Sequence, residues 1–348
     1  MNLFTLYHLI FVVKIKNNMK VCITGSSLSS LALANALVNQ NIYVDLFVNK
    51  KPYVLNKSRT IGISKSNIDY FKDNIVNIED IIWKLKKIEI FSDNLENEKL
   101  LNFENKKNEL FSIVRNSQLN KILEKNLLKN KYFKYVNLKK SLVSLKNYNI
   151  VINTDYNNQI TKKFFNKKIV KKYNSFAYTT IIKHEKIMNN TATQFFTKMG
   201  PLAFLPISNN ETSIVYSIHD SRKIDQKLLR ELIYKYNFKY NIKSISKFET
   251  FELISLSLRS YYNGNILSFG DLLHRIHPLA GQGFNMTIRD IKILIEIIKN
   301  KIEFGLPLDS SINLEFEKKS KHKNFIFLYG IDFIHEFFNL ERKQKIVC

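Results

Sequence analysis

The sequence predicts an α/β fold in which a doubly wound, mostly parallel sheet is combined with an inserted mixed β-sheet and C-terminal helices. From residue 20 the letters KVCIT, GSSLSS, LALANALVNQ and IYVDLFV give a strand, a turn, a helix and a strand, the order that a βαβ unit requires. Between residues 174 and 257 the pattern changes to β-branched and aromatic runs separated by Asn-rich turns, which indicates further strands. A helix is expected from about Ser310 to Phe327. With 348 residues, of which 45% are apolar, the chain can fill one large core or two modest ones.

The chain carries a formal charge of +24, which raises nucleic acid as a partner. Only 8 of its 54 basic residues are Arg, however, and the Lys residues are spread along the whole chain. Surfaces that bind phosphate usually enrich Arg and cluster the charge, so the composition disfavours nucleic acid and leaves an anionic membrane surface open. The two cysteines, Cys22 and Cys348, predict neither a metal-binding pair nor a disulfide framework.

The N-terminal segment needs separate treatment. Residues 2–13 form an apolar run that is too short to span a bilayer, with no basic residue before it and no small-residue cleavage site after it. Met19 stands directly before the first predicted strand. We therefore expect Met19 to be the natural start and residues 1–18 to be an N-terminal extension, with a short membrane-touching anchor as the alternative.

The stretch from residue 264 to 290 carries the strongest functional signal. Its letters, GNILSFGDLLHRIHPLAGQGFNMTIRD, give an apolar strand, an Asp directly after a Gly, a Pro, two closely spaced Gly and a helix start. Gly270 lets the strand end turn sharply, so Asp271 can present its carboxylate to a ligand hydroxyl. Gly281 and Gly283 allow close backbone approach, and the following helix directs its positive end to the same place. We expect a ligand site here; a glycine-rich loop without a ligand is the alternative.

The pattern GDxxHxxHPxxGQGxNxxxxD in this stretch resembles the second flavin motif of the FAD-dependent aromatic-ring monooxygenases, most closely that of the ubiquinone-biosynthesis hydroxylases. The resemblance implies that backbone amides of residues 281–285 stabilise the reduced flavin and that Pro278 shapes the pocket beside its ring. It also implies that His274 and His277 fix the loop. The cofactor-binding residues implied by this motif are Gly270, Asp271, Pro278, Gly281, Gln282, Gly283, Phe284 and Asn285.

The first turn departs from the same family, which has G-x-G-x-x-G here and an acidic residue at the end of the second strand. This chain has Gly25, Ser27 and Ser30 at the three Gly positions, and Val48 and Asn49 where the acid is expected. By resemblance we assign Gly25, Ser27 and Ser30 to the cofactor site. Ser27 fits if its backbone keeps a negative φ, and Ser30 lies where the helix packs closely on the strand. The missing carboxylate removes about 1 to 3 kcal/mol of cofactor affinity unless another group replaces it.

Three further residues are assigned to the cofactor by resemblance. Arg59, which leads the segment SRTIGIS, is expected at the FAD pyrophosphate, with a surface Arg as the alternative. Arg115, in the segment FSIVRNSQLNKIL, is expected to help hold the cofactor or its nucleotide end. Asp155 stands where the family has an Asp-Gly turn, here with Tyr156 in place of the Gly. A turn-forming Asp is the alternative for Asp155.

The segment ATQFFTKMGPLAFLPI resembles the sheet that forms the wall of the family's substrate pocket. We therefore expect four of its residues to lie where an aromatic substrate meets the flavin ring: Phe195, Pro201, Leu202 and Phe204. Apolar residues of this kind belong more often to a core than to a pocket, which is the alternative for each of them.

The resemblance implies a flavin-dependent monooxygenase that hydroxylates the aromatic ring of a polyprenylated phenol in ubiquinone biosynthesis. FAD is the implied cofactor, NAD(P)H the electron donor and co-substrate, and O2 the oxidant. No residue is identified as a catalytic acid or base, and no cluster predicts a metal. The alternative is a degenerate homologue that acts as a structural subunit of a quinone-biosynthesis assembly. The departures at Ser27, Val48 and Tyr156 favour this alternative, and the complete second motif opposes it.

The same resemblance divides the chain into parts. They are an N-terminal extension (1–18), a FAD-binding domain (19–64, 110–170 and 264–343) and a substrate domain (65–109 and 171–263). We expect a cytoplasmic protein with peripheral contact to the inner face of the membrane as an open alternative. The expected partners are a lipophilic phenol substrate and other ubiquinone-biosynthesis proteins.

Overall fold

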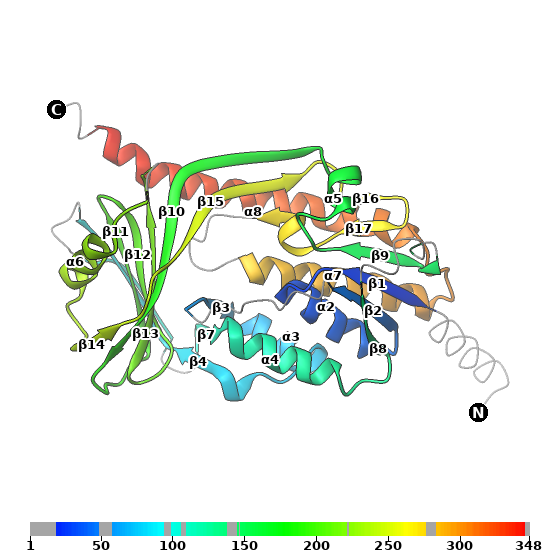
Figure 1. The fold of residues 1–348 in the computed structure, drawn as a ribbon, viewed down its shortest axis with the longest axis horizontal. Helices are drawn as coiled ribbons and strands as arrows, with labels where there is room; N and C mark the ends of the chain where they lie inside the picture. The colour runs from blue at the N-terminus through cyan, green and yellow to red at the C-terminus, as the bar shows by residue number, and fades with distance from the viewer. Residues whose placement is uncertain are drawn as a thin grey trace.

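A computed structural model describes residues 19–48, 58–93, 99–105, 109–137, 145, 147–220, 223–275 and 283–344. For residues 331, 332 and 334–344 it describes the backbone only. Figure 1 shows an elongated molecule with a mixed sheet at one end and a parallel sheet with its helices at the other. The long strands β10 and β15 and the helix α8 run between these two ends. Two sets of predictions lie outside the described residues. They are the N-terminal extension (1–18) and the site residues Pro278, Gly281 and Gln282.

The parallel sheet has the strand order β16-β17-β9-β1-β2-β8. Its neighbours pair in parallel except β16 and β17, which pair antiparallel. The four residues of β9 and the last four of β1 are buried, as expected for strands that are covered on both faces. The strands are β1 (Lys20–Thr24), β2 (Tyr43–Val48), β8 (Phe133–Asn137), β9 (Ile150–Asn153), β16 (Tyr262–Asn263) and β17 (Ile266–Ser268). The predicted α/β class is confirmed.

Helix α2 (Leu28–Val38) connects β1 to β2 and is buried along its whole length after Leu28. Its small and apolar residues suit a helix that has protein on every side. The polar Asn35 is satisfied inside this environment, since its Nδ2 donates to the carbonyls of Leu31 at 2.8 Å and Leu123 at 3.1 Å. The helix therefore holds a fixed position behind the turn that precedes it.

The second sheet is mixed and has the order β18-β15-β10-β13-β12-β11-β5-β6, with β14 paired to β10. Strand β11 pairs in parallel with β5, and the other neighbours are antiparallel. Strand β10 shifts register against β15 between Lys172 and Phe176, and Figure 1 shows both strands arching towards the parallel sheet. Its strands are β5 (Lys87–Ser92), β6 (Lys99–Glu104), β10 (Lys168–His184), β11 (Thr191–Thr197), β12 (Gly200–Pro206), β13 (Glu211–Ile218), β14 (Ile242–Ile245), β15 (Glu249–Leu258) and β18 (His274–Arg275).

A small sheet with the order β3-β7-β4 lies between the two large ones in Figure 1. It comprises β3 (Thr60–Ser64), β4 (Ile82–Leu85) and β7 (Phe111–Arg115). The other helices are α3 (Lys65–Asn74), α4 (Asn116–Leu127), α5 (Gln159–Phe164), α6 (Gln226–Tyr236), α7 (Gly283–Glu303) and α8 (Ser311–Gln344), with 3-10 turns η1 (Glu79–Ile81) and η5 (Gly270–Leu272). The predicted end of the last helix near Phe327 is wrong, because α8 continues through Gly330. A single Gly lowers helix propensity but does not end a helix that continues on both sides.

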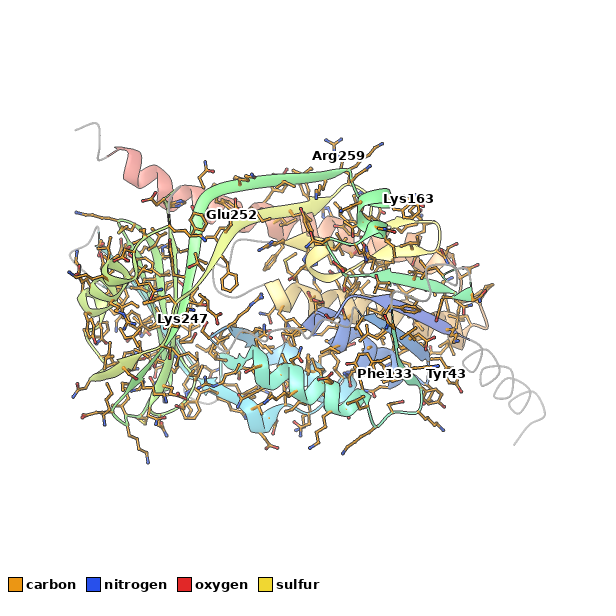
Figure 2. All side chains as sticks on the ribbon, viewed as in Figure 1. Tyr43, Phe133, Lys163, Lys247, Glu252 and Arg259 are labelled. Carbon is orange, nitrogen blue, oxygen red and sulfur yellow. The ribbon has the colours of Figure 1, made fainter. Side chains whose placement is uncertain are left out.

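Two hydrophobic cores stabilise the fold. The larger one joins the parallel sheet to α2, α4, α7 and also α3, whose Ile68 and Phe71 are buried in it. The smaller one lies between the mixed sheet and α6 and includes Phe195, Leu202 and Phe204. Figure 2 shows the side chains that fill both ends of the molecule. The division into domains stays a proposal, since α3 was expected with the substrate part and β10 crosses the expected boundary at residue 170.

Candidate flavin and substrate site

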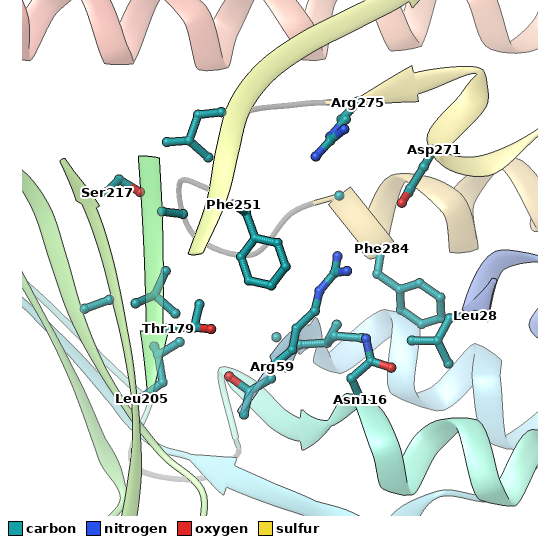
Figure 3. A pocket seen from close by; sticks show the side chains of 18 of the residues that line it. Leu28, Arg59, Asn116, Thr179, Leu205, Ser217, Phe251, Asp271, Arg275 and Phe284 are labelled. Carbon is teal, nitrogen blue, oxygen red and sulfur yellow. The ribbon is translucent and has the colours of Figure 1, made fainter. Parts of the chain in front are cut away.

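A cavity of about 400 Å³ lies where the mixed sheet faces the turns and helix starts of the other half of the molecule. Figure 3 shows its side chains. Ligand pockets typically range from about 300 to 1,000 Å³, so its size is ordinary for a binding site. One wall is formed by the first residues of α2 and α7 with β3 and α4, and the opposite wall by β10 to β13 and β15.

On β10, β12 and β13 the sheet wall of the cavity consists of every second residue, because successive strand residues point to opposite faces. It includes Gln194, Pro201, Ala203, Leu205, Val215 and Ser217. The predicted pocket residue Pro201 is therefore at the cavity. The other three, Phe195, Leu202 and Phe204, do not line this cavity: they are buried on the far face of the sheet, where Phe195 packs against Tyr236 of α6. Strands β11 and β12 carry apolar residues on both faces, so the sequence does not show which face meets the cavity.

The turn between β1 and α2 keeps the backbone of a dinucleotide-binding turn. Gly25 has φ +113°, and a Cβ there would lie 2.3 Å from Thr154 Oγ1, so only Gly fits. Ser27 caps α2 with φ −75°, the negative value that a Ser at this position requires, and its side chain lines the cavity. Ser30 is fully buried, and its hydroxyl bonds Thr154 Oγ1 at 2.7 Å. Gly25 and Ser30 thus position the turn, and only Ser27 of the three lines the cavity.

The turn after β17 brings Asp271 to the cavity. Gly270 has φ +64°, and a Cβ there would lie 2.6 Å from Ser29 Cβ, so this Gly lets the turn pack directly on the start of α2. Gly270 itself is buried and does not line the cavity. Asp271 is exposed, lines the cavity and points its carboxylate into it in Figure 3. This is the geometry that the Gly-Asp pair predicts.

The start of α7 is fixed by buried polar contacts. His274 Nε2 lies 2.5 Å from Asp290 Oδ2, with both side chains almost completely buried, which ties β18 to α7. Asn285 Oδ1 accepts from Ser64 N at 3.1 Å and from Asn67 Nδ2 at 2.8 Å, and its Nδ2 donates to the Gly62 carbonyl at 2.9 Å. Asn285 is therefore a residue that holds α7 against β3 and α3, and not a cavity residue as the resemblance implies. Gly283 and Phe284 do line the cavity.

Lys292 extends the polar contacts of Asn285 through Asn67. Lys292 Nζ donates to Asn67 Oδ1 at 2.9 Å and lies 4.8 Å from the centre of the Tyr70 ring. Burial lowers the pKa of Lys292 and raises that of Tyr70 to about 12. Because Asn67 also donates to Asn285, Lys292 helps to orient the amide that positions the first turn of α7.

The other three residues assigned by resemblance, Arg59, Arg115 and Asp155, also differ in whether they line the cavity. Arg59 lines the cavity, and its side chain extends into it in Figure 3. Arg115 does not line the cavity, because its guanidinium pairs with Glu211 Oε2 of β13 at 2.5 Å. Asp155 does not line it either; its Oδ1 accepts from Asn157 N at 2.9 Å, which is the turn-forming role. Arg115 and Asp155 thus have contacts within the protein and do not line this cavity, and their assignment to the cofactor stays a prediction.

Several cavity residues were not predicted. Asn116 and Asn120 lie one turn apart at the start of α4, and Phe251 and Arg275 come from β15 and β18. The pattern of α4 could have revealed the first two, since Asn at positions i and i+4 shares one helix face. Phe251 and Arg275 become neighbours of the motif only through sheet pairing, which a single sequence does not show.

The residues present fit a flavin. Gly25 and Gly270 leave room for close backbone packing, two helix starts direct N-H groups to the cavity, and Asp271 provides an acceptor for a polyol hydroxyl. The remaining wall is formed by the sheet and is mostly apolar, with a few hydroxyl and amide side chains. The described residues include no group of three or more His, Cys, Asp and Glu side chains that could hold a metal ion. None of the helices in this described part is long and apolar enough to cross a membrane.

Comparison with known proteins supports the same cofactor. Residues 159–303 match the model of an FAD binding domain. The chain is 30% identical over 154 residues to 3-demethoxyubiquinol 3-hydroxylase of Escherichia coli, which covers 42% of this chain and 39% of that protein. It is 25% identical over 242 residues to the mitochondrial ubiquinone biosynthesis monooxygenase COQ6 of Schizosaccharomyces pombe, covering 55% of this chain and 50% of that protein. The chain thus spans half or less of the length of these relatives.

Solved structures show the same fold. The FAD-dependent monooxygenase PqsL of Pseudomonas aeruginosa has a TM-score of 0.71 at 14% identity, covering 91% of this chain and 94% of that one. HpxO of Klebsiella pneumoniae, solved with FAD and uric acid, has a TM-score of 0.73 at 12% identity, covering 94% of each chain. Motif, family match and fold agree on FAD as the cofactor, and over about half of its length the chain is similar to ubiquinone-biosynthesis monooxygenases.

Proposed function

We propose that this protein is a flavin-dependent monooxygenase that hydroxylates the aromatic ring of a polyprenylated phenol in ubiquinone biosynthesis, with NAD(P)H as electron donor. The observation that carries the proposal is the cavity itself. One wall is lined by the flavin-motif residues Asp271, Gly283 and Phe284, and the other by the apolar sheet. The names of the curated relatives support the substrate class.

FAD, when bound, supplies the chemistry that carries oxygen from O2 to an electron-rich ring. The chain itself binds and orients the reactants. Asp271 would accept a hydrogen bond from a ribityl hydroxyl, and the N-H groups at the start of α7, from Gly283 onward, would face the electron-rich side of the ring system. The buried His274 and Asp290 pair and the Asn285 contacts keep this helix start in place.

The sheet wall would bind the phenol. Leu205 and Val215 offer apolar contact that excludes water from the ring, and Phe251 closes the same space from β15 in Figure 3. Thr179 and Ser217 are the hydroxyl-bearing residues labelled on this wall, and either can hydrogen bond to a phenol oxygen. Orientation by contact and exclusion of water are thus the functions that we assign to the sheet.

A product assay tests the proposal. The purified protein, loaded with FAD, is given NAD(P)H, O2 and a short-chain prenylated phenol, and the product is analysed by mass spectrometry. We expect a product one oxygen atom heavier than the substrate, with the oxygen derived from O2. A protein that binds FAD yet produces no oxygenated phenol from any prenylated phenol would instead support the structural-subunit alternative.

We also propose that the protein contacts the membrane peripherally, where a polyprenylated substrate and other ubiquinone-biosynthesis proteins would be found. Support comes from α8, whose side chains Phe325, Ile326, Tyr329 and Phe333 are between 54% and 70% exposed. The exposed Lys318 and Lys323 precede them on the same helix. Exposed aromatic residues beside Lys are typical of helices that lie at a lipid interface.

Vesicle sedimentation tests this contact. We expect binding to phosphatidylglycerol vesicles that weakens in Tyr329→Asp, because a carboxylate replaces an aromatic ring at the lipid surface. The matched control is Tyr234→Asp, since Tyr234 on α6 is similarly exposed, at 54% against 57% for Tyr329. Equal binding by both variants and the wild type would remove α8 from the proposal.

A further inference from the structure

Arg275 is a cavity residue that the flavin motif does not explain. It follows His274 in β18, and His274 points into the protein to reach Asp290. Both residues line the cavity, and the Arg275 side chain extends into it in Figure 3. Its backbone is held by pairing with Leu256 of β15. Sheet pairing therefore holds the backbone from which the guanidinium extends.

Among the described residues, Arg275 has no ion-pair partner. Asp271 and Glu252 also line the cavity, yet no ion pair or hydrogen bond joins either of them, or any other described residue, to Arg275. Figure 3 shows the Arg275 and Arg59 side chains extending towards each other from opposite sides, into the space between Phe251 and Phe284. A guanidinium has five N-H donors and no acceptor, and its planar fork matches carboxylate and phosphate oxygens.

We infer that Arg275 binds an anionic oxygen group of the ligand in this cavity, opposite Arg59. The inference rests on the proposed function, which places a flavin and a phenol here. Two sources share the required chemistry: the diphosphate of FAD, and a carboxylate or phenolate on the aromatic substrate. A diphosphate or a carboxylate can accept two parallel N-H···O bonds from the guanidinium, and a phenolate oxygen can accept a charge-assisted bond. In each case the opposite charge makes the contact stronger than one to a neutral acceptor.

The diphosphate source would also explain a departure in the sequence. The acid expected at the end of β2 is replaced, with Val48 and Asn49 at its place. An added cation at the other side of the cavity would recover binding free energy that the missing acceptor removes. The substrate source would instead make Arg275 a specificity residue that selects anionic phenols.

The test compares Arg275→Gln with a matched control, Arg259→Gln. Arg259 directly follows β15, the strand with which Arg275 pairs, and it carries the same charge. Both arginines are exposed, but Arg259 does not line the cavity and points away from the body of the protein in Figure 2. Binding to flavin-free protein is measured by calorimetry with four probes: FAD, riboflavin, inorganic diphosphate and 4-hydroxybenzoate. Riboflavin is the neutral probe, since it has the flavin ring without phosphate.

For Arg275→Gln we expect Kd to rise about 10- to 100-fold for an anionic probe, the loss typical of a charge-assisted hydrogen bond pair, with riboflavin unchanged. A loss for FAD and diphosphate assigns the FAD source, and a loss for 4-hydroxybenzoate alone assigns the substrate. Arg275→Lys should recover part of the loss. The inference is overturned if Arg275→Gln matches Arg259→Gln for every probe, or if wild-type protein binds no anionic probe. Failure of FAD and riboflavin to bind wild-type protein would separately contradict the proposed function.

Discussion

The two halves of the flavin site are stabilised in different ways. The second motif, from Gly270 to Asp290, is fixed by buried polar pairs that connect separate elements, among them the 2.5 Å contact from His274 to Asp290. The first turn is fixed by a chain of small hydroxyl groups, in which Ser30 bonds Thr154 at 2.7 Å and Thr154 donates to the Thr24 carbonyl at 2.9 Å. Among the described residues, Gly25 in the first turn and Gly270 in the second motif both have a positive φ.

The difference shows which substitutions such a site tolerates. At the first turn, Ser at two glycine positions keeps the backbone, because Ser27 has a negative φ and Ser30 needs only to be small. In the second motif, by contrast, His274, Asn285 and Asp290 complete buried polar contacts that connect separate elements. Four predictions test this contrast, beginning with the largest expected effect.

Among the four changes, replacing His274 should lower the free energy of unfolding most. Asp290 is fully buried, and among the described residues its Oδ1 has no partner, so His274 is its principal contact. His274→Leu leaves a buried carboxylate alone and should lower the free energy of unfolding by about 4 kcal/mol. Urea unfolding measures this loss. The double variant His274→Leu, Asp290→Leu should regain part of it, and a single-variant loss below about 1 kcal/mol would contradict the assigned role.

Gly25→Ala should be the most damaging change in the first turn. The φ of +113° is unfavourable for any residue with a Cβ, and that Cβ would lie 2.3 Å from Thr154 Oγ1. Strain and overpacking together should lower stability by about 3 kcal/mol and weaken FAD binding. Thermal unfolding and a flavin titration give both values. Wild-type stability would show that the turn is less constrained than its contacts indicate.

Gly270→Ala has a matched control in Gly264→Ala. The two residues have similar φ values, +64° and +57°, but a Cβ at Gly270 meets Ser29 at 2.6 Å whereas one at Gly264 meets nothing within 4 Å. We expect a loss of about 1 kcal/mol at Gly264 from backbone strain alone and about 2 to 3 kcal/mol at Gly270. Chemical denaturation of both variants isolates the cost of the contact. Equal losses would mean that the turn does not depend on its packing against α2.

Ser27→Gly should have the smallest effect. Ser27 accepts a capping bond from Ser30 N at 3.3 Å, and Gly at a helix N-cap costs only a few tenths of a kcal/mol, whereas Ser27→Ala should cost about 1 kcal/mol. FAD affinity in Ser27→Gly should be equal to that of the wild type or tighter, because the change restores the family glycine. A weaker affinity would show that the Ser27 hydroxyl itself contacts the cofactor.

The sequence predicted the fold class and the place of the second motif, because β1, α2 and β2 follow a pattern set by local periodicity and Gly270 marks a sharp turn. It did not predict which face of β11 and β12 meets the cavity, since both faces carry apolar residues and α6 packs on the face turned away from the cavity. It also did not predict that Arg115 pairs with Glu211, which lies 96 residues away in sequence. Contacts formed by sheet pairing and helix docking are non-local, so a single sequence carries no direct signal for them.

The central claim is that the intact second motif binds flavin although the first turn has lost two glycines and its acid. A titration of flavin-free protein with FAD, followed by visible absorption and by flavin fluorescence, tests it most directly. We predict saturable binding of one FAD per chain, with an oxidised-flavin absorption band at about 450 nm and quenched fluorescence. A folded protein that stays colourless and leaves FAD fluorescence unchanged would contradict the account.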